Sequence, residues 1–278
     1  MVLDPACVGL STEPTAYSYT SRDTILYALG IGAKRDELDY LYEGRGPKVF
    51  PTFAVIPAYP ALMAAMERTG GSWDKVVHGH QKVTLHESIP PQGKLFTTAT
   101  VKAAYDLRRM AQVVTETRTT DENGTHLFDT EWSILFLGEG GWGGDPPPGR
   151  ETTTPTRPSD FRIEETTLPE QALLYRLMGD GNPLHADPDF QLVARFKGVP
   201  ILHGLCTYGF MARAVAHGAC GGDASRIKHI GARFSKPVWP GDTLITEGWV
   251  EGHRVWVRTS TRESNEPVLT HGYAEIKT

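Results

Sequence analysis

The chain has 278 residues, of which 40% are hydrophobic and 22% are charged, and its net charge is −5. This composition is typical of a folded globular protein, and the mildly acidic balance offers no broad basic surface, which argues against a nucleic-acid partner. No apolar run approaches the roughly 20 residues of a membrane-spanning helix, so no membrane partner is expected either.

The first half of the chain predicts two helices followed by a run of strands. The pattern favours a short helix over residues 21–29 and, after an irregular stretch, an apolar helix over about residues 58–68. Strand-like patterns follow at residues 76–86, 95–104, 112–119 and 126–137. Their short connections favour antiparallel hairpins.

A segment rich in glycine and proline divides the chain near its middle. Residues 138–149 end in a run of three prolines before the last glycine, and a Thr/Pro stretch continues to Pro158. The glycine spacing formally fits a dinucleotide-binding fingerprint, but the prolines forbid the helix that must follow it. We therefore predict a linker over 141–158, between an N-terminal unit over 1–140 and a C-terminal unit over 159–278.

The second half repeats the order of the first. It predicts helices over residues 169–177 and about 204–217, and then strands at 227–236, 244–250, 255–261 and 268–277. Three pairs of similar segments occur in the same order at an offset of 148 or 149: 26–30 with 174–178, 51–55 with 200–204, and 89–95 with 238–244. Two copies of one unit are indicated, each with a helix that an antiparallel sheet wraps, in an α+β fold.

The densest polar cluster lies at residues 179–188, in a loop with two glycines and two prolines. A turn at Asn182 and Pro183 could bring Asp180 and His185 into one pocket, where a carboxylate and an imidazole can hold a water and move its protons. The alternative is that Asp180 caps a turn and His185 is an ordinary core histidine. His78 and His80 alternate with no Cys or carboxylate at a metal-site spacing, so no metal is expected there.

Residues 175–188 resemble the signature of the (R)-specific enoyl-CoA hydratases, the hydratase 2 or MaoC-like family. Residues 200–205 and 232–242 resemble the next two motifs, and residues 51–53, 78–79 and 138–144 match in the first half. The resemblance implies a double hotdog fold and a reversible syn hydration of trans-2-enoyl-CoA to (3R)-3-hydroxyacyl-CoA. It implies an acyl-CoA thioester as partner, no metal and no other cofactor.

The resemblance also implies roles for particular residues. Asp180 and His185 would be catalytic, and the backbone N–H of Gly204 would bind the thioester oxygen. The other implied substrate-binding residues are Asn182, His78, Gly79, Arg108 and Phe234. At the offset of 148, Asp180 falls on Gly32 and His185 on Glu37, so the first half lacks the pair and is expected to serve binding.

Several expectations concern the substrate and the setting. An acyl tunnel is expected where Pro57, Ala58, Pro60 and Ala61 break and thin the first apolar helix. Three cysteines without a CxxC pair suggest reduced thiols, and with the ending Ile276-Lys277-Thr278 they favour a cytoplasmic location, or a peroxisomal one if a targeting tail has been lost. A homodimer is implied by the resemblance. Two alternatives stay open: a hotdog acyl-CoA thioesterase and a non-catalytic acyl-CoA-binding subunit.

Overall fold

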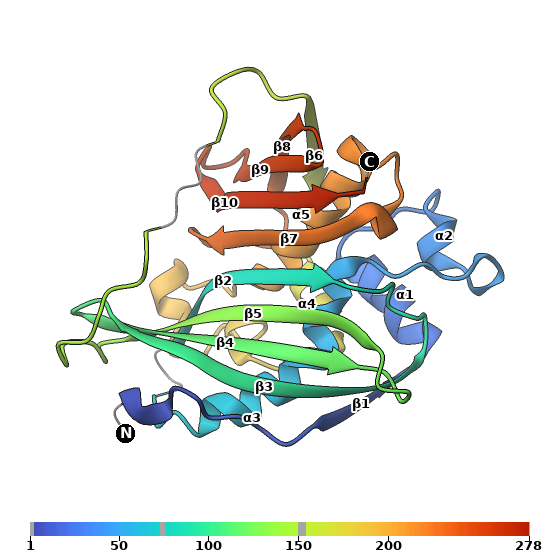
Figure 1. Cartoon of the computed structure of the whole chain (residues 1–278). Coiled ribbons are helices and arrows are strands. Elements are labelled where there is room, and N and C mark those ends of the chain that lie inside the picture. Colours follow the sequence, from blue (N-terminus) through green and yellow to red (C-terminus); the bar gives the residue numbers. More distant parts are fainter. Residues whose placement is uncertain (1–2, 73–75, 150–153, 278) are drawn as a thin grey trace.

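The structure is a computed structural model that describes residues 3–72, 76–149 and 154–277. Within these residues, strands β1 to β10 form one antiparallel sheet in the order β1-β3-β4-β5-β2-β7-β10-β9-β8-β6 (Figure 1). Helices α3 and α5 lie along this sheet and provide much of the core that it covers. None of the described helices is long and apolar enough to cross a membrane.

The two halves of the chain build the same unit. The first half contains β1 (Thr15–Tyr19), α1 (Ser21–Gly30), α2 (Leu38–Leu41), α3 (Val55–Glu67), β2 (Val76–Leu85), β3 (Gly93–Asp106), β4 (Met110–Thr120) and β5 (His126–Leu137). The second half contains β6 (Phe161–Thr166), α4 (Gln171–Tyr175), α5 (Gly204–Ala219), β7 (Ile227–Phe234), β8 (Thr243–Glu251), β9 (Arg254–Thr261) and β10 (Pro267–Ile276).

The strand order shows the duplication directly. The first unit has the order β1-β3-β4-β5-β2 and the second has β6-β8-β9-β10-β7, which is the same order with each strand replaced by its counterpart. The units join through β2 and β7, where His80 pairs with Arg233 and Thr84 with His229. The predicted α+β double hotdog fold is confirmed. The sequence analysis missed the short helix α2 and the short edge strands β1 and β6, whose burial alternates along the strand.

The first apolar helix corrects one expectation. Helix α3 runs unbroken from Val55 to Glu67, although it contains Pro60. Pro57 lies in the first turn, where a missing N–H costs no intrahelical hydrogen bond. The prediction that the prolines break this helix is therefore wrong, and the acyl tunnel that was expected beside it stays a prediction.

The glycine-rich segment after β5 is held against the turn between β3 and β4. The Asp106 carboxylate accepts hydrogen bonds from the backbone N–H groups of Arg108, Gly141 and Gly143 at 2.7–2.8 Å. A Cβ atom at Gly140 would lie 2.5 Å from the carbonyl oxygen of Met110, so only glycine allows this approach. The first residues of the predicted linker are thus docked on the N-terminal unit.

Candidate active site

The polar loop after α4 is shaped by one glycine and one cap. The 3-10 helix η5 (Arg176–Met178) ends at Gly179, whose φ of 112° lies in the left-handed region that favours glycine. A second 3-10 helix, η6 (Pro183–His185), follows, and the side-chain oxygen of Asn182 caps it by accepting the N–H of Leu184 at 3.0 Å. This turn carries the His185 side chain back to Asp180, as the sequence predicts.

The orientation of His185 is set by a backbone carbonyl. Its Nδ1 lies 2.8 Å from the carbonyl oxygen of Ile201, which can only accept a hydrogen bond, so Nδ1 carries the proton and Nε2 is the basic nitrogen. Burial lowers the pKa of His185, while the Asp180 charge and the Ile201 carbonyl act in the opposite direction. A neutral imidazole beside a carboxylate can accept a proton from water.

A second histidine, which the sequence analysis did not single out, completes the cluster. The rings of His203 and His185 stack with centroids 3.8 Å apart, and Nε2 of His203 lies 4.0 Å from Oδ2 of Asp180. The His203 side chain is 1% exposed. Burial lowers its pKa to about 2, and the nearby His185 and Arg176 side chains add to this effect, while the contact with the Asp180 backbone acts in the opposite direction. The only signal for it in the sequence was its position directly before Gly204.

Among the residues that the structure describes, two groups of side chains have donor atoms close enough to be considered as metal ligands. Asp180, His185 and His203 each offer an atom within 4.8 Å of the others, and the two imidazole rings are stacked. In the second group, Nε2 of His86 and Nε2 of His126 each lie 2.7 Å from a different oxygen of Asp129, so both carboxylate oxygens have a hydrogen-bond partner.

Helix α5 begins beside the loop that carries Asp180 and His185, where the N–H of Ile201 bonds to the carbonyl of Leu184. Its first residue, Gly204, has a backbone N–H that the helix leaves without an internal acceptor, and the helix dipole places partial positive charge there. A Cβ atom at Gly204 would lie 3.0 Å from the ring of Phe234, at the end of β7. A glycine therefore allows the helix terminus to pack on this aromatic ring.

The N-terminal unit contributes His78 to the same place. The His78 ring lies 4.6 Å from that of Phe234 and 5.3 Å from that of Trp132, and its Nε2 is 3.0 Å from the His80 carbonyl. Burial lowers the pKa of His78 to about 4, so its ring is neutral at neutral pH. Gly79 occupies the bulge between His78 and His80.

Tyr59 of α3 is a further residue of this region that the sequence analysis missed. Its ring lies 6.3 Å from that of Trp132, and burial together with the negative charge of Asp180 raises its pKa to about 12. The offset of 149 places Tyr59 on Tyr208 of α5, and this match was the available signal. The candidate site thus lies between the two units, with the loop of Asp180 and His185 on one and α3 on the other.

Two predicted site residues are exposed, although the backbone N–H of Asn182 donates a hydrogen bond to the Asp180 carboxylate at 3.1 Å. Asn182 is exposed and uses its side-chain oxygen as a helix cap. Arg108 is exposed in the turn between β3 and β4, and its φ is 65°. That turn lies at the same end of the sheet as His78, because Val76 pairs with Phe136 and Phe136 with Ala111. β4 and β2 are two strands apart, which corresponds to about 10 Å.

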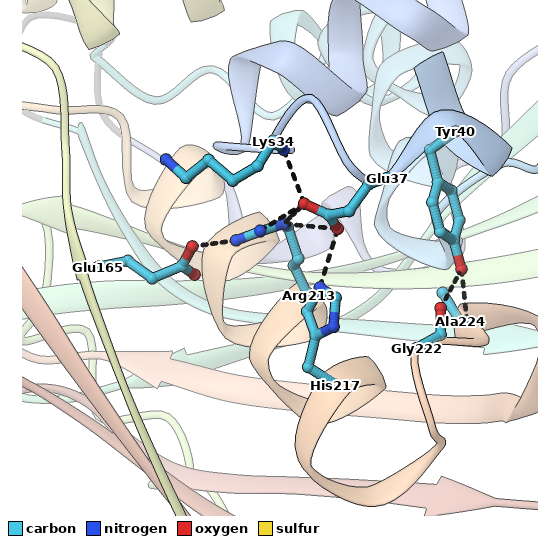
Figure 2. A network of polar contacts seen from close by, with 8 residues as sticks. All are labelled: Lys34, Glu37, Tyr40, Glu165, Arg213, His217, Gly222 and Ala224. Carbon is cyan, nitrogen blue, oxygen red and sulfur yellow. Dashed lines mark hydrogen bonds and ion pairs between the residues drawn. The ribbon is translucent and has the colours of Figure 1, made fainter. Parts of the chain in front are cut away.

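The position equivalent to His185 in the first unit has a different use. Glu37 lies at the centre of a polar network in which its carboxylate accepts hydrogen bonds from Arg213 and His217 of α5 and from the backbone N–H of Lys34 (Figure 2). Arg213 also contacts Glu165 of β6. The network joins the loop after α1 to α5 of the other unit. The first unit therefore uses this position for contacts between the units and does not repeat the Asp180–His185 pair.

Solved structures define the class of protein. A Mycobacterium tuberculosis protein described as having a double hotdog fold aligns with a TM-score of 0.61 at 13% identity over 96% of this chain and 95% of its own, which shows the fold. A MaoC-like dehydratase from Phytophthora capsici aligns with a TM-score of 0.85 at 30% identity over 100% of this chain and 98% of its own. This chain is a double hotdog protein of the MaoC-like kind.

Sequence comparisons identify the family. The model of the MFE-2 hydratase 2 N-terminal domain matches residues 17–138, and that of the MaoC like domain matches residues 150–271. The peroxisomal enoyl-CoA hydratase 2 of Arabidopsis thaliana is 38% identical over 95% of this chain and 92% of its own length. The 3-hydroxyacyl-thioester dehydratase Y of M. tuberculosis is 40% identical over 95% of this chain and 94% of its own. The chain belongs to the enoyl-CoA hydratase 2 family.

Proposed function

We propose that this chain catalyses the reversible syn addition of water to trans-2-enoyl-CoA, giving (3R)-3-hydroxyacyl-CoA in fatty-acyl-CoA metabolism, with Asp180 and His185 as the catalytic pair. The observation that carries this proposal is the approach of a carboxylate to an imidazole whose Nδ1 proton is directed at a backbone carbonyl. That arrangement leaves Nε2 of His185 without its own proton, in a cluster that includes the Asp180 carboxylate.

The reaction needs one proton to leave water and one to reach the substrate. The Asp180–His185 pair accepts a proton from water as the water oxygen bonds to C3 of the enoyl group. The electrons of the C2–C3 double bond move toward the thioester, which becomes enolate-like, and the pair delivers a proton to C2. Because one pair serves both atoms, both additions occur on the same face. The two groups are coupled, so the protonation steps belong to the pair.

The negative charge that develops on the thioester oxygen needs a donor. The N–H of Gly204 at the start of α5 is suited to this, since it has no acceptor within the helix and lies at the positive end of the helix dipole. The thioester itself activates C3, so the proposal includes no metal and no redox cofactor.

The remaining predicted residues would bind the substrate. Phe234 and His78 pack on each other beside Gly204, and they would line the path of the thioester and the pantetheine, with Gly79 behind His78. Arg108, exposed at the same end of the sheet, would approach the CoA phosphates. Asn182 would direct its amide NH₂ to the water or a polar substrate atom while its oxygen caps η6.

Location and assembly are also proposals. The three cysteines are free and buried, which supports a reducing compartment, and we propose the cytoplasm. The name of the Arabidopsis relative makes the peroxisome the alternative.

A homodimer is supported by the exposed side chains of Leu168, Leu173 and Leu177 beside α4. Light scattering should give a dimer mass for the wild type and a monomer mass for Leu177→Glu.

One assay separates this function from its alternatives. Purified protein is mixed with trans-2-enoyl-CoA substrates of short and medium acyl length, and the conjugated enoyl-thioester absorbance and the free thiol of CoA are followed together. Loss of absorbance without free thiol supports the hydratase. Release of thiol without hydration would identify a thioesterase, and binding without either change would leave a non-catalytic acyl-CoA-binding subunit.

A further inference from the structure

His203 is a buried polar side chain without a well-formed hydrogen bond. It immediately precedes α5, its side chain is 1% exposed, and neither Nδ1 nor Nε2 makes a well-formed hydrogen bond with the residues that the structure describes, although the Asp180 backbone lies close enough to raise the pKa of the ring. A buried imidazole always carries at least one N–H donor, and leaving such a donor unpaired is costly. Its partner should therefore be a molecule that enters the site.

The space beside His203 already has an expected occupant. Nε2 of His203 is 4.0 Å from Oδ2 of Asp180, which is too far for a direct hydrogen bond but allows one water to touch both atoms at about 2.8 Å. Asp180, His185 and His203 each offer an atom within 4.8 Å of the other two. A single water can therefore contact all three side chains at once.

We propose that His203 is a positioning residue for the reacting water, which it holds by donating a hydrogen bond from Nε2 while Asp180 and His185 accept the two hydrogens of that water. This inference rests on the proposed hydratase function, which it extends by one residue. Three contacts occupy two hydrogens and one lone pair of the water. The remaining lone pair then has a fixed direction, and it is the one that bonds to C3.

The surroundings of His203 suit a donor that exchanges no proton. Its neighbours are the carboxylate and the backbone of Asp180, the stacked His185 ring, the Tyr175 ring at 5.0 Å and the cation of Arg176. Burial and the nearby basic groups hold the pKa of His203 at about 2, so the ring stays neutral while the catalytic pair changes its protonation. A neutral His203 also avoids repulsion when His185 receives a proton.

The test uses three substitutions that differ in where they place a donor. Gln can place an amide NH₂ near the position of Nε2, Asn can place one near Nδ1, and Phe keeps a stacked ring without a donor. We expect His203→Phe and His203→Asn to lower kcat by about 10-fold or more with KM changed less than about threefold, and His203→Gln to retain more of kcat than either. A purely structural role for His203 would not distinguish Gln from Asn in this way.

The outcomes separate this inference from the proposed function. A wild-type protein without hydratase activity would refute the function itself. An active wild type whose His203→Phe variant keeps the same kcat, or whose Asn variant matches the Gln variant, would refute only the role of His203.

A second measurement covers the case in which the variants fail to fold. A crystal structure of the wild type with a saturated acyl-CoA, which cannot react, should show a water within about 3.2 Å of Nε2 of His203 and of both catalytic side chains. Electron density that lacks this water, or that pairs His203 with a protein group, would overturn the inference.

Discussion

At the scale of single residues, the chemistry depends on backbone groups that are distant along the chain. The Ile201 carbonyl, which is 16 residues from His185, decides which imidazole nitrogen is basic. Because Asp180 and His185 are close together in the sequence, both could be identified as candidate catalytic residues from the sequence alone. The tautomer of His185 and the proximity of His203 and Tyr59 to Asp180 could not be predicted, because these depend on how α3 and α5 pack against the loop.

The catalytic pair can be tested by removing one function at a time. Asp180→Asn and His185→Gln should each lower kcat by about 100-fold or more, because each removes a proton acceptor without changing the size of the side chain greatly. Steady-state kinetics with trans-2-enoyl-CoA measure this effect. Asp189→Asn, which changes an exposed carboxyl on the same loop, should leave kcat unchanged. Near-normal turnover of either catalytic variant would contradict the assignment.

At the scale of elements, α5 combines two tasks. Its N-terminus faces the site at Gly204, and its middle carries Arg213, which forms the ion network with Glu37 and Glu165. A Cβ atom at Gly209 would lie 2.3 Å from Ile31, so α5 also packs closely on the loop of the other unit. The apolar spacing of this helix was predictable, but its ionic partners were not, because Glu37 and Arg213 are 176 residues apart.

Gly204 tests the position of the helix terminus. Gly204→Ala keeps the backbone N–H but places a methyl group 3.0 Å from the ring of Phe234, so either the ring or the helix end must shift. We expect kcat/KM to fall by about 10-fold with a small change in Tm. Gly149→Ala, at a position with no atom within 4 Å of the added Cβ, is the matched control. Equal kinetics for both variants would mean that the terminus does not need this close packing.

Arg213 tests the network between the units. Arg213→Met removes the partner of the buried Glu37 carboxylate, and breaking a buried pair in this way costs about 3–5 kcal/mol. Urea unfolding should show this loss, and the double variant Arg213→Met/Glu37→Leu should recover part of it, because the buried Glu37 carboxylate is no longer left unpaired, while Glu165 still lacks its Arg213 partner. Additive losses in the double variant would argue that the two side chains do not stabilise each other.

At the scale of the whole molecule, duplication explains both what the sequence predicted and what it missed. The repeated segments predicted two units of one α+β design, and eight of the ten strands were predicted at nearly their observed positions. The edge strands β1 and β6 escaped detection because each is short and pairs on one side only, with β3 and β8. The pairing of β2 with β7, which joins the two units into one sheet, could also not be predicted from the sequence, because it depends on long-range contacts.

The network makes the stability of the whole molecule depend on pH. Burial alone would raise the pKa of Glu37, but hydrogen bonds from His217, Arg213 and the Lys34 amide lower it to about 2, against 4.5 for a free glutamate. A carboxyl with a lowered pKa contributes stability that is present above its unfolded pKa and is lost as the pH falls. The free energy of unfolding of the wild type should therefore decrease between about pH 5 and pH 2. Glu37→Gln should show a smaller decrease over this range, and equal decreases in both proteins would contradict this role of Glu37.

The stereochemistry of addition tests the central claim most directly. Hydration of trans-2-enoyl-CoA in D₂O, followed by NMR analysis of the product, reports both the configuration at C3 and the face that received deuterium at C2. If the Asp180–His185 pair handles both atoms from one side, the product is a single diastereomer with 3R configuration and with deuterium added on the same face as the hydroxyl. Deuterium on the opposite face, a mixture of diastereomers, or a 3S product would contradict the account.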